Sequence, residues 1–564
     1  MNKVHVSCIS AAILGLGSTG ATAALDRTGD FALLDNSGEF HQLSRYQHRK
    51  AVVLMSYAQN CHGMEDMLSE YRALQSRYGG QGIEFLLLDS HDLGRAALAD
   101  LNAGLPILQD SGQLVSEALG IRSAGEVRVL NPDRMSLFYS GMVSTELDQT
   151  LSGLLQGPIR DTVKVEGSNS CEIAYPVRDA HLASVPDYAT EVAPVIIENC
   201  VQCHRQFGAG PFPMDRYISL LGWSPMIKEV LLNKRMPPAQ IDPERGHSPT
   251  ARYLATEDIQ TIVHWINAGG PRGEGADPLA ELRFEADQAW ILGEPDYVLT
   301  TPVHAVPASG ILDEIYVDME LPFEEDKWLR AVQFQPTANG TLHHLIAVVT
   351  EPDEDFWGDE RSSTTATRRF VEGYQPGKAI VSEFSEGTGV FIPKGHKLSM
   401  QFQYVGMGVA VSNVNKIGFY FAEESSSELT ERLVQAVSTP FVLPPNQHDI
   451  PVEAEYVFTE DVVITGVRAR MNERGKKMSF SVTHPDGTTH DILSIPAYNY
   501  AWQPHYVLAN PVRVPAGSIV HVIGAFDNSV SNPFNPDPGA EVRSGLGNDE
   551  EMFTGYFTFH RASE

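Results

Sequence analysis

The sequence predicts a multidomain α+β protein with an α/β domain, a small all-α domain and two tandem antiparallel β-sandwiches. A length of 564 residues exceeds what one hydrophobic core can organise. Strand and helix patterns alternate near the N-terminus, helical patterns surround a CVQCH motif, and short strands with turns fill the rest. The hydrophobic fraction of 42% and the charged fraction of 20% are those of an ordinary globular protein.

The N-terminus has the form of a secretory signal peptide over residues 1–23. One lysine precedes a short apolar stretch, and Ala21-Thr22-Ala23 fits a cleavage site. The stretch is too short to span a bilayer, and no other apolar run approaches that length. We therefore expect a periplasmic or secreted protein without a membrane span. Cleavage removes Cys8 and leaves four cysteines in an oxidising compartment.

Residues 25–160 predict the α/β domain. A hairpin-like pair precedes a buried strand, AVVLMSY, and Cys61 follows that strand. The helical stretch MLSEYRALQSRYGG then leads to a second buried strand, GIEFLLLDS. This order resembles the thioredoxin-like, peroxiredoxin-related redoxins. The position of Cys61 matches their reactive cysteine, which stands at a helix N-terminus where the helix dipole favours a thiolate.

Two features leave the role of Cys61 open. Cys61 is followed by His-Gly-Met, so the chain lacks the CxxC pair of many redoxins. Cys171 lies in a predicted linker, 161–184, and is a candidate resolving partner. A structural disulfide between the two, or an inert thiol, is at least as compatible with the sequence.

The CVQCH motif at residues 200–204 is the attachment signature of haem c. A structural zinc site normally needs a second Cys/His pair nearby, and the chain offers none. A thioredoxin-type dithiol would follow a strand, whereas a helical pattern precedes this motif. We therefore predict that Cys200 and Cys203 attach haem c and that His204 ligates its iron. Residues 185–275 then form a small helical cytochrome c domain.

The sixth iron ligand is predicted to be a methionine, which is common in such domains. Met236 is the first candidate because prolines in KRMPP stop the preceding helix and fix a turn there. Met214 and Met226 are rivals, and a purely structural role for Met236 stays open. The stretch TEDIQTIVHWINAGG closes the domain as an amphipathic helix that Thr256 is expected to cap.

From about residue 285 the pattern changes to short strands with regular turns, which predicts two β-sandwiches over 285–425 and 430–564. His343 and His344 are adjacent on one predicted strand. Neighbours on a strand point to opposite faces, so one histidine should face the core. Binding of one metal by both requires a bulge or a strand end at this place.

The order of segments resembles the copper type II, ascorbate-dependent monooxygenases, the peptidylglycine and dopamine β-monooxygenase family. More closely, it resembles bacterial relatives that join a redoxin, a CxxCH cytochrome domain and a jelly-roll type double sandwich. The matching pieces include CVQCHRQFGAGPFPM, KRMPP, GYQPG, FIPKGHKLSMQFQY, PDGTTHDILSIPAYNYAWQ and DEEMFTGYF. The resemblance covers nearly the whole mature chain.

The resemblance implies two separated copper sites, of which only three of six ligand positions keep a ligand. In the order of the family's ligands the positions are His343, His344, Gln403, Arg470, Asn472 and Met552. Glutamine is a poor copper ligand, and a protonated arginine repels a copper ion. Other histidines offer no spacing that argues for replacement; they are His396, His484, His490, His505 and His521.

Three functions follow from these features. The first is a haem- and copper-dependent monooxygenase that hydroxylates a C–H bond with electrons supplied through the haem. The second is an electron-transfer or partner subunit whose copper sites are lost, in a hetero- or homo-oligomer. The third is a thiol redox protein centred on Cys61. The net charge of −31 disfavours nucleic acid and anionic membranes, so we expect a small-molecule substrate or a redox partner protein.

Overall fold

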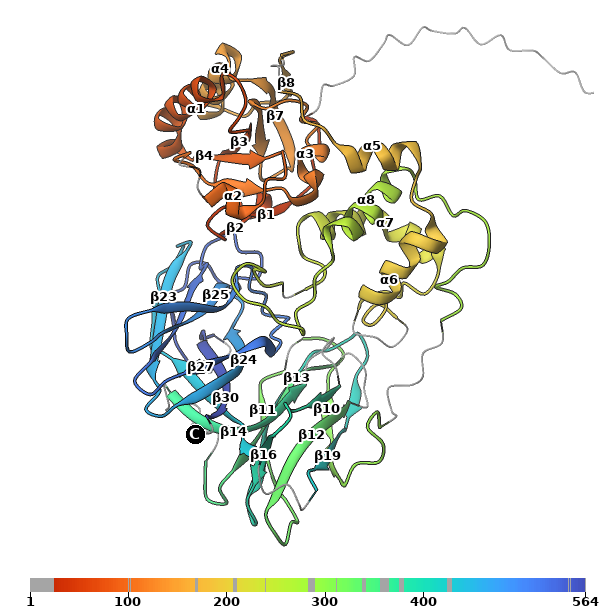
Figure 1. Cartoon of the computed structure of the whole chain (residues 1–564), viewed down its shortest axis with the longest axis vertical. Coiled ribbons are helices and arrows are strands. Elements are labelled where there is room, and N and C mark those ends of the chain that lie inside the picture. The colour runs from red at the N-terminus through yellow and green to blue at the C-terminus, as the bar shows by residue number, and fades with distance from the viewer. Residues whose placement is uncertain are drawn as a thin grey trace, which may run out of the picture.

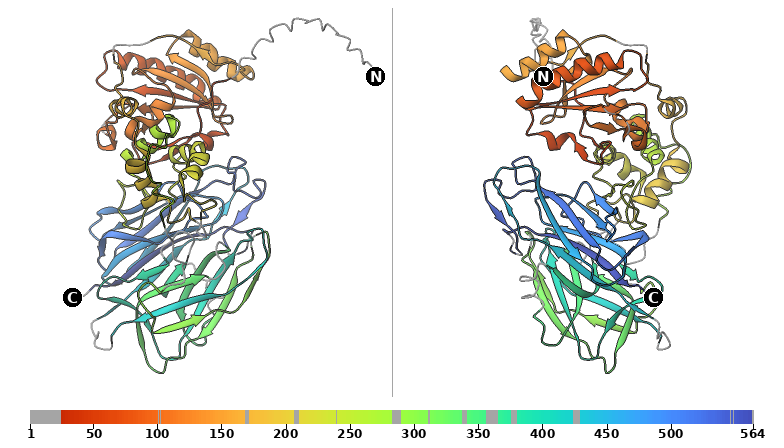
Figure 2. Two further views of the ribbon diagram at one scale, coloured as in Figure 1. Left: turned by 90° about the vertical axis from the view of Figure 1, so that its right-hand side faces the viewer. Right: turned by 60° about the vertical axis from the view of Figure 1, so that its left-hand side comes forward.

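A computed structural model describes residues 25–562, apart from 100, 102, 168–170, 206–209, 239, 283–289, 311, 337–340, 356–364, 375–379, 424–428, 546 and 548. The predicted signal peptide lies outside these residues. Figure 1 and Figure 2 show the α/β domain and the first β-sandwich at opposite ends of the molecule. The helical unit and the second sandwich lie between them. No helix in the described ranges is long and apolar enough to cross a membrane.

The α/β domain is built on a six-stranded sheet of order β5-β4-β3-β6-β7-β8. Strands β3, β4 and β5 are parallel, and β6 runs antiparallel to β3. The elements are β1 (Ala32–Leu34), β2 (Phe40–Gln42), β3 (Ala51–Tyr57), α1 (Met64–Tyr78), β4 (Ile83–Asp89), α2 (Arg95–Ala99), β5 (Ile107–Gln109), α3 (Leu114–Ala118), β6 (Glu126–Asn131), β7 (Ser136–Met142), α4 (Thr145–Gln156) and β8 (Val163–Lys164). The predicted hairpin, buried strands and helix are confirmed.

The buried strands explain why this domain folds as predicted. All seven residues of β3 are buried, as a central strand covered on both faces requires. Helix α1 buries residues spaced three or four apart along one face, from Met64 to Tyr78. The hydroxyl of Tyr71 on that face donates to the carbonyl oxygens of Val53 and Leu86, at 2.8 and 2.9 Å, and ties the helix to the sheet.

The helical unit contains α5 (Pro176–Ala183), the π-helical turn η4 (Tyr188–Val192), α6 (Ala193–Asn199), α7 (Tyr217–Leu232) and α8 (Thr256–Asn267). Its core surrounds Trp265, which is fully buried. The expected cap of α8 is wrong: Ala255 is the N-cap residue, and Thr256 is the first helical residue. Glu257 and Asp258 in the first turn stabilise the helix N-terminus through the helix dipole instead.

The C-terminal region is rich in β-structure, with several antiparallel sheets. One eight-stranded sheet of order β11-β17-β13-β14-β21-β30-β24-β27 runs through both sandwiches. A six-stranded sheet, β20-β16-β12-β19-β9 with β15 on β12, covers its first half, and the four-stranded sheet β23-β28-β25-β26 covers its second half. The tandem sandwiches are therefore joined by pairing of β14 with β21, which the sequence did not indicate.

The strands of the first sandwich are β9 (Tyr297–Thr300), β10 (His304–Val306), β11 (Ile315–Glu320), β12 (Lys327–Pro336), β13 (Leu342–Thr350), β14 (Thr365–Tyr374), β15 (Val381–Glu383), β16 (Thr388–Ile392), β17 (Lys397–Tyr404), β18 (Val411–Asn413) and β19 (Asn415–Phe421). The remaining strands are β20 (Thr430–Glu431), β21 (Leu433–Ser438), β22 (Val442–Leu443), β23 (Ile450–Val457), β24 (Val462–Met471), β25 (Gly475–Thr483), β26 (Thr489–Ile495), β27 (Tyr506–Val514), β28 (Ile519–Phe526), β29 (Val542–Arg543) and β30 (Phe553–Arg561).

A loop that leaves the helical unit joins three parts of the molecule. Asp242 is fully buried and accepts from Nη1 of Arg95 in the α/β domain, at 2.8 and 2.7 Å. The backbone N–H of Asp242 also donates to the Ser494 carbonyl oxygen in the second sandwich, at 2.9 Å. A Cβ on Gly246 would lie within 2.4 Å of the Ile492 carbonyl oxygen, and its φ is +116°. Only glycine therefore lets this loop approach the second sandwich so closely.

Candidate functional site

The first candidate site is a disulfide between Cys61 and Cys171, whose Cα atoms lie 5.8 Å apart across 110 residues of sequence. Cys61 follows β3 and precedes α1, and its side chain is 8% exposed. Cys171 is more accessible, at intermediate burial. The structure thus joins the two cysteines that the sequence left as alternatives.

Backbone pairing holds the Cys171 segment in place. The N–H of Ala124 donates to the Cys171 carbonyl at 3.0 Å, and the N–H of Ile173 donates to the Arg122 carbonyl at 2.8 Å. The buried carboxylate of Glu126 accepts from the backbone N–H groups of Arg122 and Ser123 and shapes this loop. The disulfide therefore closes over a short antiparallel pair at the start of β6.

The second candidate site is the CVQCH turn, which directly follows α6. Cys200 and Cys203 are free thiols of intermediate burial. Burial raises the pKa of the Cys200 thiol to about 12. Nη1 of Arg252 lies 3.3 Å from the sulfur of Cys203. No disulfide joins these two thiols.

The His204 ring is buried, and the backbone fixes one of its two nitrogens. Its ring is 8% exposed, and burial lowers its pKa, which favours the neutral ring that a metal binds. Nδ1 lies 3.0 Å from the Phe212 carbonyl oxygen, so Nδ1 carries the proton and Nε2 keeps its lone pair. Within the described ranges, Nε2 has no hydrogen-bond partner. The residues present therefore fit haem ligation through Nε2.

An apolar surface beside His204 supports the same fit. The His204 ring packs on Phe212, with centroids 4.9 Å apart, and Phe212 stacks on Trp223 at 4.3 Å. On α7, Trp223 is 39% exposed, Met226 42% and Ile218 64%. These side chains leave apolar atoms exposed on α7 next to the Phe212–Trp223 stack, and a flat apolar ring system is one ligand that would cover them.

The structure does not single out a sixth iron ligand. Met236 lies in the turn after α7, where its N–H donates to the Val230 carbonyl at 3.0 Å, and it is half-buried. Met214 is packed into the helical core, with 5% exposure. Its backbone N–H donates to the His204 carbonyl at 2.7 Å. Met236 stays the prediction because the core packing of Met214 already accounts for that side chain.

The third candidate site is a cleft of about 200 Å³ between the two sandwiches. It collects five of the six positions that the sequence assigned to copper, and its lining includes His344, Gln403, Arg470, Asn472 and Met552. The resemblance implies two separated metal sites, whereas here residues from both sets face one space.

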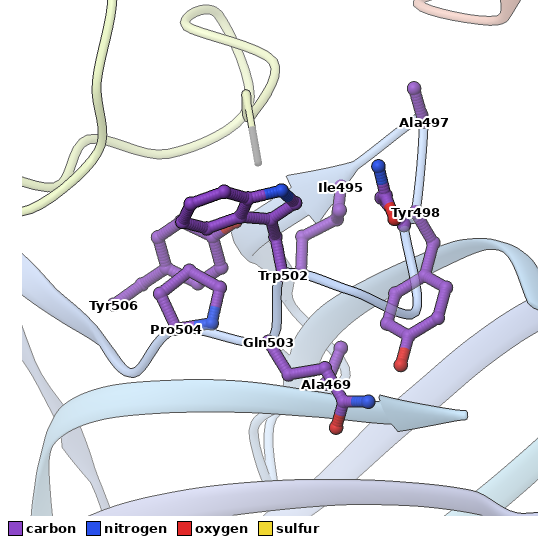
Figure 3. Close-up of a pocket in the computed structure, with 9 residues that line it drawn as sticks. Ala469, Ile495, Ala497, Tyr498, Trp502, Gln503, Pro504 and Tyr506 are labelled. Atoms are coloured by element: carbon purple, nitrogen blue, oxygen red, sulfur yellow. The ribbon is translucent and has the colours of Figure 1, made fainter. Parts of the chain in front are cut away.

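Figure 3 shows a small apolar pocket beneath Trp502 and beside Tyr498. Gln503 lines both the pocket and the cleft. The pocket has a volume of only about 10 Å³, which is the space of a single water molecule. Ligand binding in this region is therefore assigned to the larger cleft.

His343 and His344 turn toward each other, so the expectation that they face opposite sides of the strand is wrong. The pairing of β13 with β17 shifts register between Leu342 and His344, and this irregularity brings the two Nδ1 atoms to 3.2 Å. Burial, and then the charge of Arg470, lowers the pKa of His344 well below its usual range. Two neutral rings whose Nδ1 atoms converge in this way fit a single metal ion with two protein ligands.

His344 also has an unmet hydrogen-bonding demand. The residue is 6% exposed, and its buried Nε2 atom has no partner among the described residues. Nε2 lies 3.9 Å from the carboxylate of Glu314, beyond hydrogen-bonding distance. The neighbouring His343 ring stacks on Tyr500, whose hydroxyl donates to Gln403 at 3.0 Å.

Arg470 stands at a position that the resemblance assigns to a ligand of the second copper. Its guanidinium, on β24, donates to Gln401 at 3.0 Å and to Glu314 at 2.9 Å, both in the first sandwich. The side-chain amide of Asn472 donates to the Glu550 backbone carbonyl at 3.1 Å. The residues of this second set therefore do not fit a copper ion, because a fixed cation stands where two ligands are needed and Met552 alone remains.

The other histidines do not supply replacement ligands within the described part of the cleft lining. His505 Nε2 bonds Thr558 at 2.9 Å, and His484 packs on His490. His396 stands in the turn before β17. His521 on β28 lies beside Glu453 and Glu455 on the paired strand β23, with one nitrogen or oxygen of each side chain within 4.8 Å of the others. None of them lines the cleft.

Sequence reasoning missed Glu314 and Glu550, which line the cleft, and the buried Glu551 next to Glu550 in the chain. Glu551 is fully buried, and its carboxylate accepts from the N–H groups of Asn472 and Arg474, at 2.9 and 2.8 Å. Burial raises its pKa to about 7. Glu551 stands one residue before Met552 in DEEMF, which was the only available signal, whereas nothing near Glu314 points to the cleft.

Comparison with known proteins supports the N-terminal assignment. Residues 25–137 match the AhpC/TSA family. A hypothetical protein from Sinorhizobium meliloti 1021 is 20% identical, with 27% of this chain and 95% of that chain covered, at a TM-score of 0.24. Peroxidoxin BcpB from Mycobacterium tuberculosis is 20% identical, with 25% and 100% covered, at a TM-score of 0.21. No curated protein matches the chain.

A third solved structure is the thioredoxin domain of a thiol-disulfide oxidoreductase from Bacteroides vulgatus. It is 13% identical, with 24% of this chain and 98% of that chain covered, at a TM-score of 0.21. At these TM-scores the structural likenesses carry no further argument. The family match and the sheet order together identify residues 25–137 as a thioredoxin-like redoxin domain of the AhpC/TSA type.

Proposed function

We propose that this protein is an oxidoreductase that carries haem c on its helical unit and acts in electron transfer. The single observation that supports it most is the set of His204 contacts, with Nδ1 held by the Phe212 carbonyl and Nε2 left open beside two free thiols. Cys200 and Cys203 would form the thioether bonds, and His204 would ligate the iron from one side. A haem bound there supplies a one-electron redox couple.

The cleft favours the electron-transfer or partner-subunit function over the monooxygenase. His343 and His344 would hold one copper ion through Nδ1. Arg470 and Glu314 already neutralise each other where a second ion would bind. The chain's own residues thus offer a binding cleft with one metal position, and the two-copper chemistry of the resembling family lacks its second ligand set.

Haem and metal content test this proposal directly. The protein is produced in a host competent for cytochrome maturation and is then loaded with copper. We expect a Soret absorption band that survives acid-acetone extraction and is lost in Cys203→Ala. One copper per chain is expected, and it is lost in His343→Ala but kept in the control His490→Gln. A colourless product would refute the haem assignment, and two coppers per chain would restore the monooxygenase.

A second candidate function is thiol–disulfide exchange at Cys61 and Cys171, which the disulfide itself favours. An external dithiol would attack the more accessible Cys171 sulfur and release Cys61 as the leaving thiolate. A second attack by the dithiol on the mixed disulfide then leaves two protein thiols and one oxidised dithiol. The start of α1 stabilises the Cys61 thiolate through the helix dipole, although Glu65 and Asp66 in its first turn oppose this effect.

Turnover of a dithiol with peroxide or with a model disulfide tests this second function. Cys61→Ser and Cys171→Ser are each expected to abolish turnover, because either change removes the disulfide that the dithiol attacks. Unchanged turnover in Cys61→Ser would exclude the function.

We further propose that the mature protein acts in the periplasm or outside the cell. A disulfide in the redoxin domain and covalent haem both require an oxidising compartment or its assembly machinery. The measured mass of the exported protein is expected to correspond to a chain that begins after residue 23. A full-length chain confined to the cytoplasm would contradict this.

A further inference from the structure

Two histidines and one carboxylate form a continuous hydrogen-bonded chain where the helical unit meets the redoxin domain. Nε2 of His264, on α8, lies 3.0 Å from Oε2 of Glu117, on α3. Nδ1 of the same ring lies 2.8 Å from Nδ1 of His181, on α5. The side chain of His264 is 5% exposed and that of Glu117 11%. The chain of contacts therefore connects α3, α8 and α5 with little access for water.

The contact between the two Nδ1 atoms has room for one proton. In a neutral pair of rings, one Nδ1–H donates to the lone pair of the other Nδ1. When one further proton is bound, one ring is an imidazolium, and the other ring still offers its lone pair. Two imidazolium rings would place two N–H donors face to face at 2.8 Å, which is repulsive and leaves no hydrogen bond.

The surrounding charges favour the first proton and oppose the second. Glu117 balances one positive charge on the pair. Burial and the His264 ring lower the pKa of His181, and Glu191 on η4 raises it more weakly. Lys228 on α7 adds a positive charge that acts on Glu117, while its ammonium is held by Asn267 at 2.7 Å. A second imidazolium would therefore be offset only by the weaker effect of Glu191.

The elements joined by this contact differ in how firmly they are packed. Helix α8 is fixed to the redoxin domain by Gln260, whose amide donates to the Gly112 carbonyl at 2.9 Å. A Cβ on Gly112 would lie 2.4 Å from the Thr256 side chain, and the φ of Gly112 is +73°. The N-terminus of α8 therefore packs very closely against the redoxin domain at Gly112. Helix α5 has no buried residue, and Leu182 on it is 73% exposed. Loss of the His181 contact therefore affects α5 before α8.

We propose that the Glu117–His264–His181 chain is an acid-released latch. Uptake of a second proton by the two histidines detaches α5 from α8. Helix α5 begins five residues after Cys171, so its release loosens the connection between the disulfide segment and the CVQCH unit. The latch would make the coupling of the two redox-active units depend on the pH of the compartment.

Hydrogen exchange of the α5 backbone in the full-length oxidised protein tests the latch. After correction for the intrinsic exchange rate, wild-type protection of α5 is expected to fall about tenfold as the pH is lowered from about 6.5 to about 4, because the second proton binds below the ordinary range of histidine. In His181→Gln the protection is expected to be independent of pH. In Glu117→Gln the loss is expected at lower pH, because removal of the carboxylate disfavours proton uptake by the histidine pair.

His490→Gln serves as the control because His490 is an exposed histidine of the second sandwich, and it is expected to behave as wild type. His181 is half-buried on a helix without buried residues, so its replacement should leave the fold intact. A pH dependence in His181→Gln equal to that of wild type would overturn the proposal. Wild-type protection that stays constant over this pH range would also overturn it.

Discussion

Replacing Arg470 with methionine is expected to destabilise the β-rich region by about 3 kcal/mol, because it leaves the largely buried Glu314 carboxylate without its cationic partner and, among the described residues, with only the Tyr316 hydroxyl as a hydrogen-bond donor. The pair joins residues 156 positions apart, at 2.9 Å. The side chains are 6% and 13% exposed, so solvent screens the interaction little. Methionine matches the length of the arginine stem, which limits the loss of packing.

The matched control is Arg561→Met, which removes an exposed ion pair in the same sandwich. Arg561 lies 2.9 Å from Glu460, but the two side chains are 59% and 49% exposed. Exposed pairs contribute about 0–1 kcal/mol, so this change should have a small effect. The double variant Arg470→Met/Glu314→Gln should recover most of the loss, because it leaves no unpaired charge.

Calorimetric unfolding measures these differences, with the transition of the β-rich region followed separately from that of the redoxin domain. A loss of about 3 kcal/mol lowers the midpoint of a region of this size by about 6–10 °C. Equal midpoints for Arg470→Met and Arg561→Met would refute the assignment of a stabilising ion pair between Arg470 and Glu314. Failure of the double variant to recover would show that packing, rather than charge, causes the loss.

Three further predictions follow from buried or constrained residues. Burial raises the pKa of Glu551 to about 7, from 4.5 in the unfolded chain. The folded protein then holds a proton that the unfolded chain has lost, so stability falls by about 3 kcal/mol as the pH rises from about 4.5 to about 7 and is level above that range. Denaturant titrations should show this slope in wild type and not in Glu551→Gln; equal slopes would contradict it. Gly246→Ala should lower the stability of the second sandwich by about 2 kcal/mol, because the added Cβ would clash with the Ile492 carbonyl at a positive φ. Gly517→Ala is the control, because the nearest atom to its Cβ lies 3.7 Å away. Equal thermal midpoints for the two variants would argue against the close approach at Gly246. Reduction of Cys61–Cys171 should cost about 3–5 kcal/mol, given a loop of 110 residues, and should expose residues 171–173 to hydrogen exchange; unchanged exchange there would show that the backbone pairing suffices.

Local patterns predicted much of the fold and several candidate residues. Seven consecutive apolar or small residues in AVVLMSY predict a central buried strand, and β3 covers those residues. Spacings of three and four predict α1, α7 and α8, with ends within a few residues of those observed. The CVQCH spacing predicts haem attachment from the sequence, and the His204 contacts support the same proposal. The cap of α8 was missed because a capping residue and a first helical residue differ by one position only.

The sequence by itself determined the order of the units, the element types and the chemistry that each unit has available. Tertiary structure alone decided which residues meet. It joined Cys61 to Cys171, turned His343 and His344 toward each other, and placed Arg470 against Glu314. It also fused the two sandwiches through β14 and β21 and assembled the Glu117–His264–His181 chain. The physical reason is that periodicity reflects contacts within a few residues along the chain, whereas these contacts mostly join distant segments and depend on the packing of whole layers.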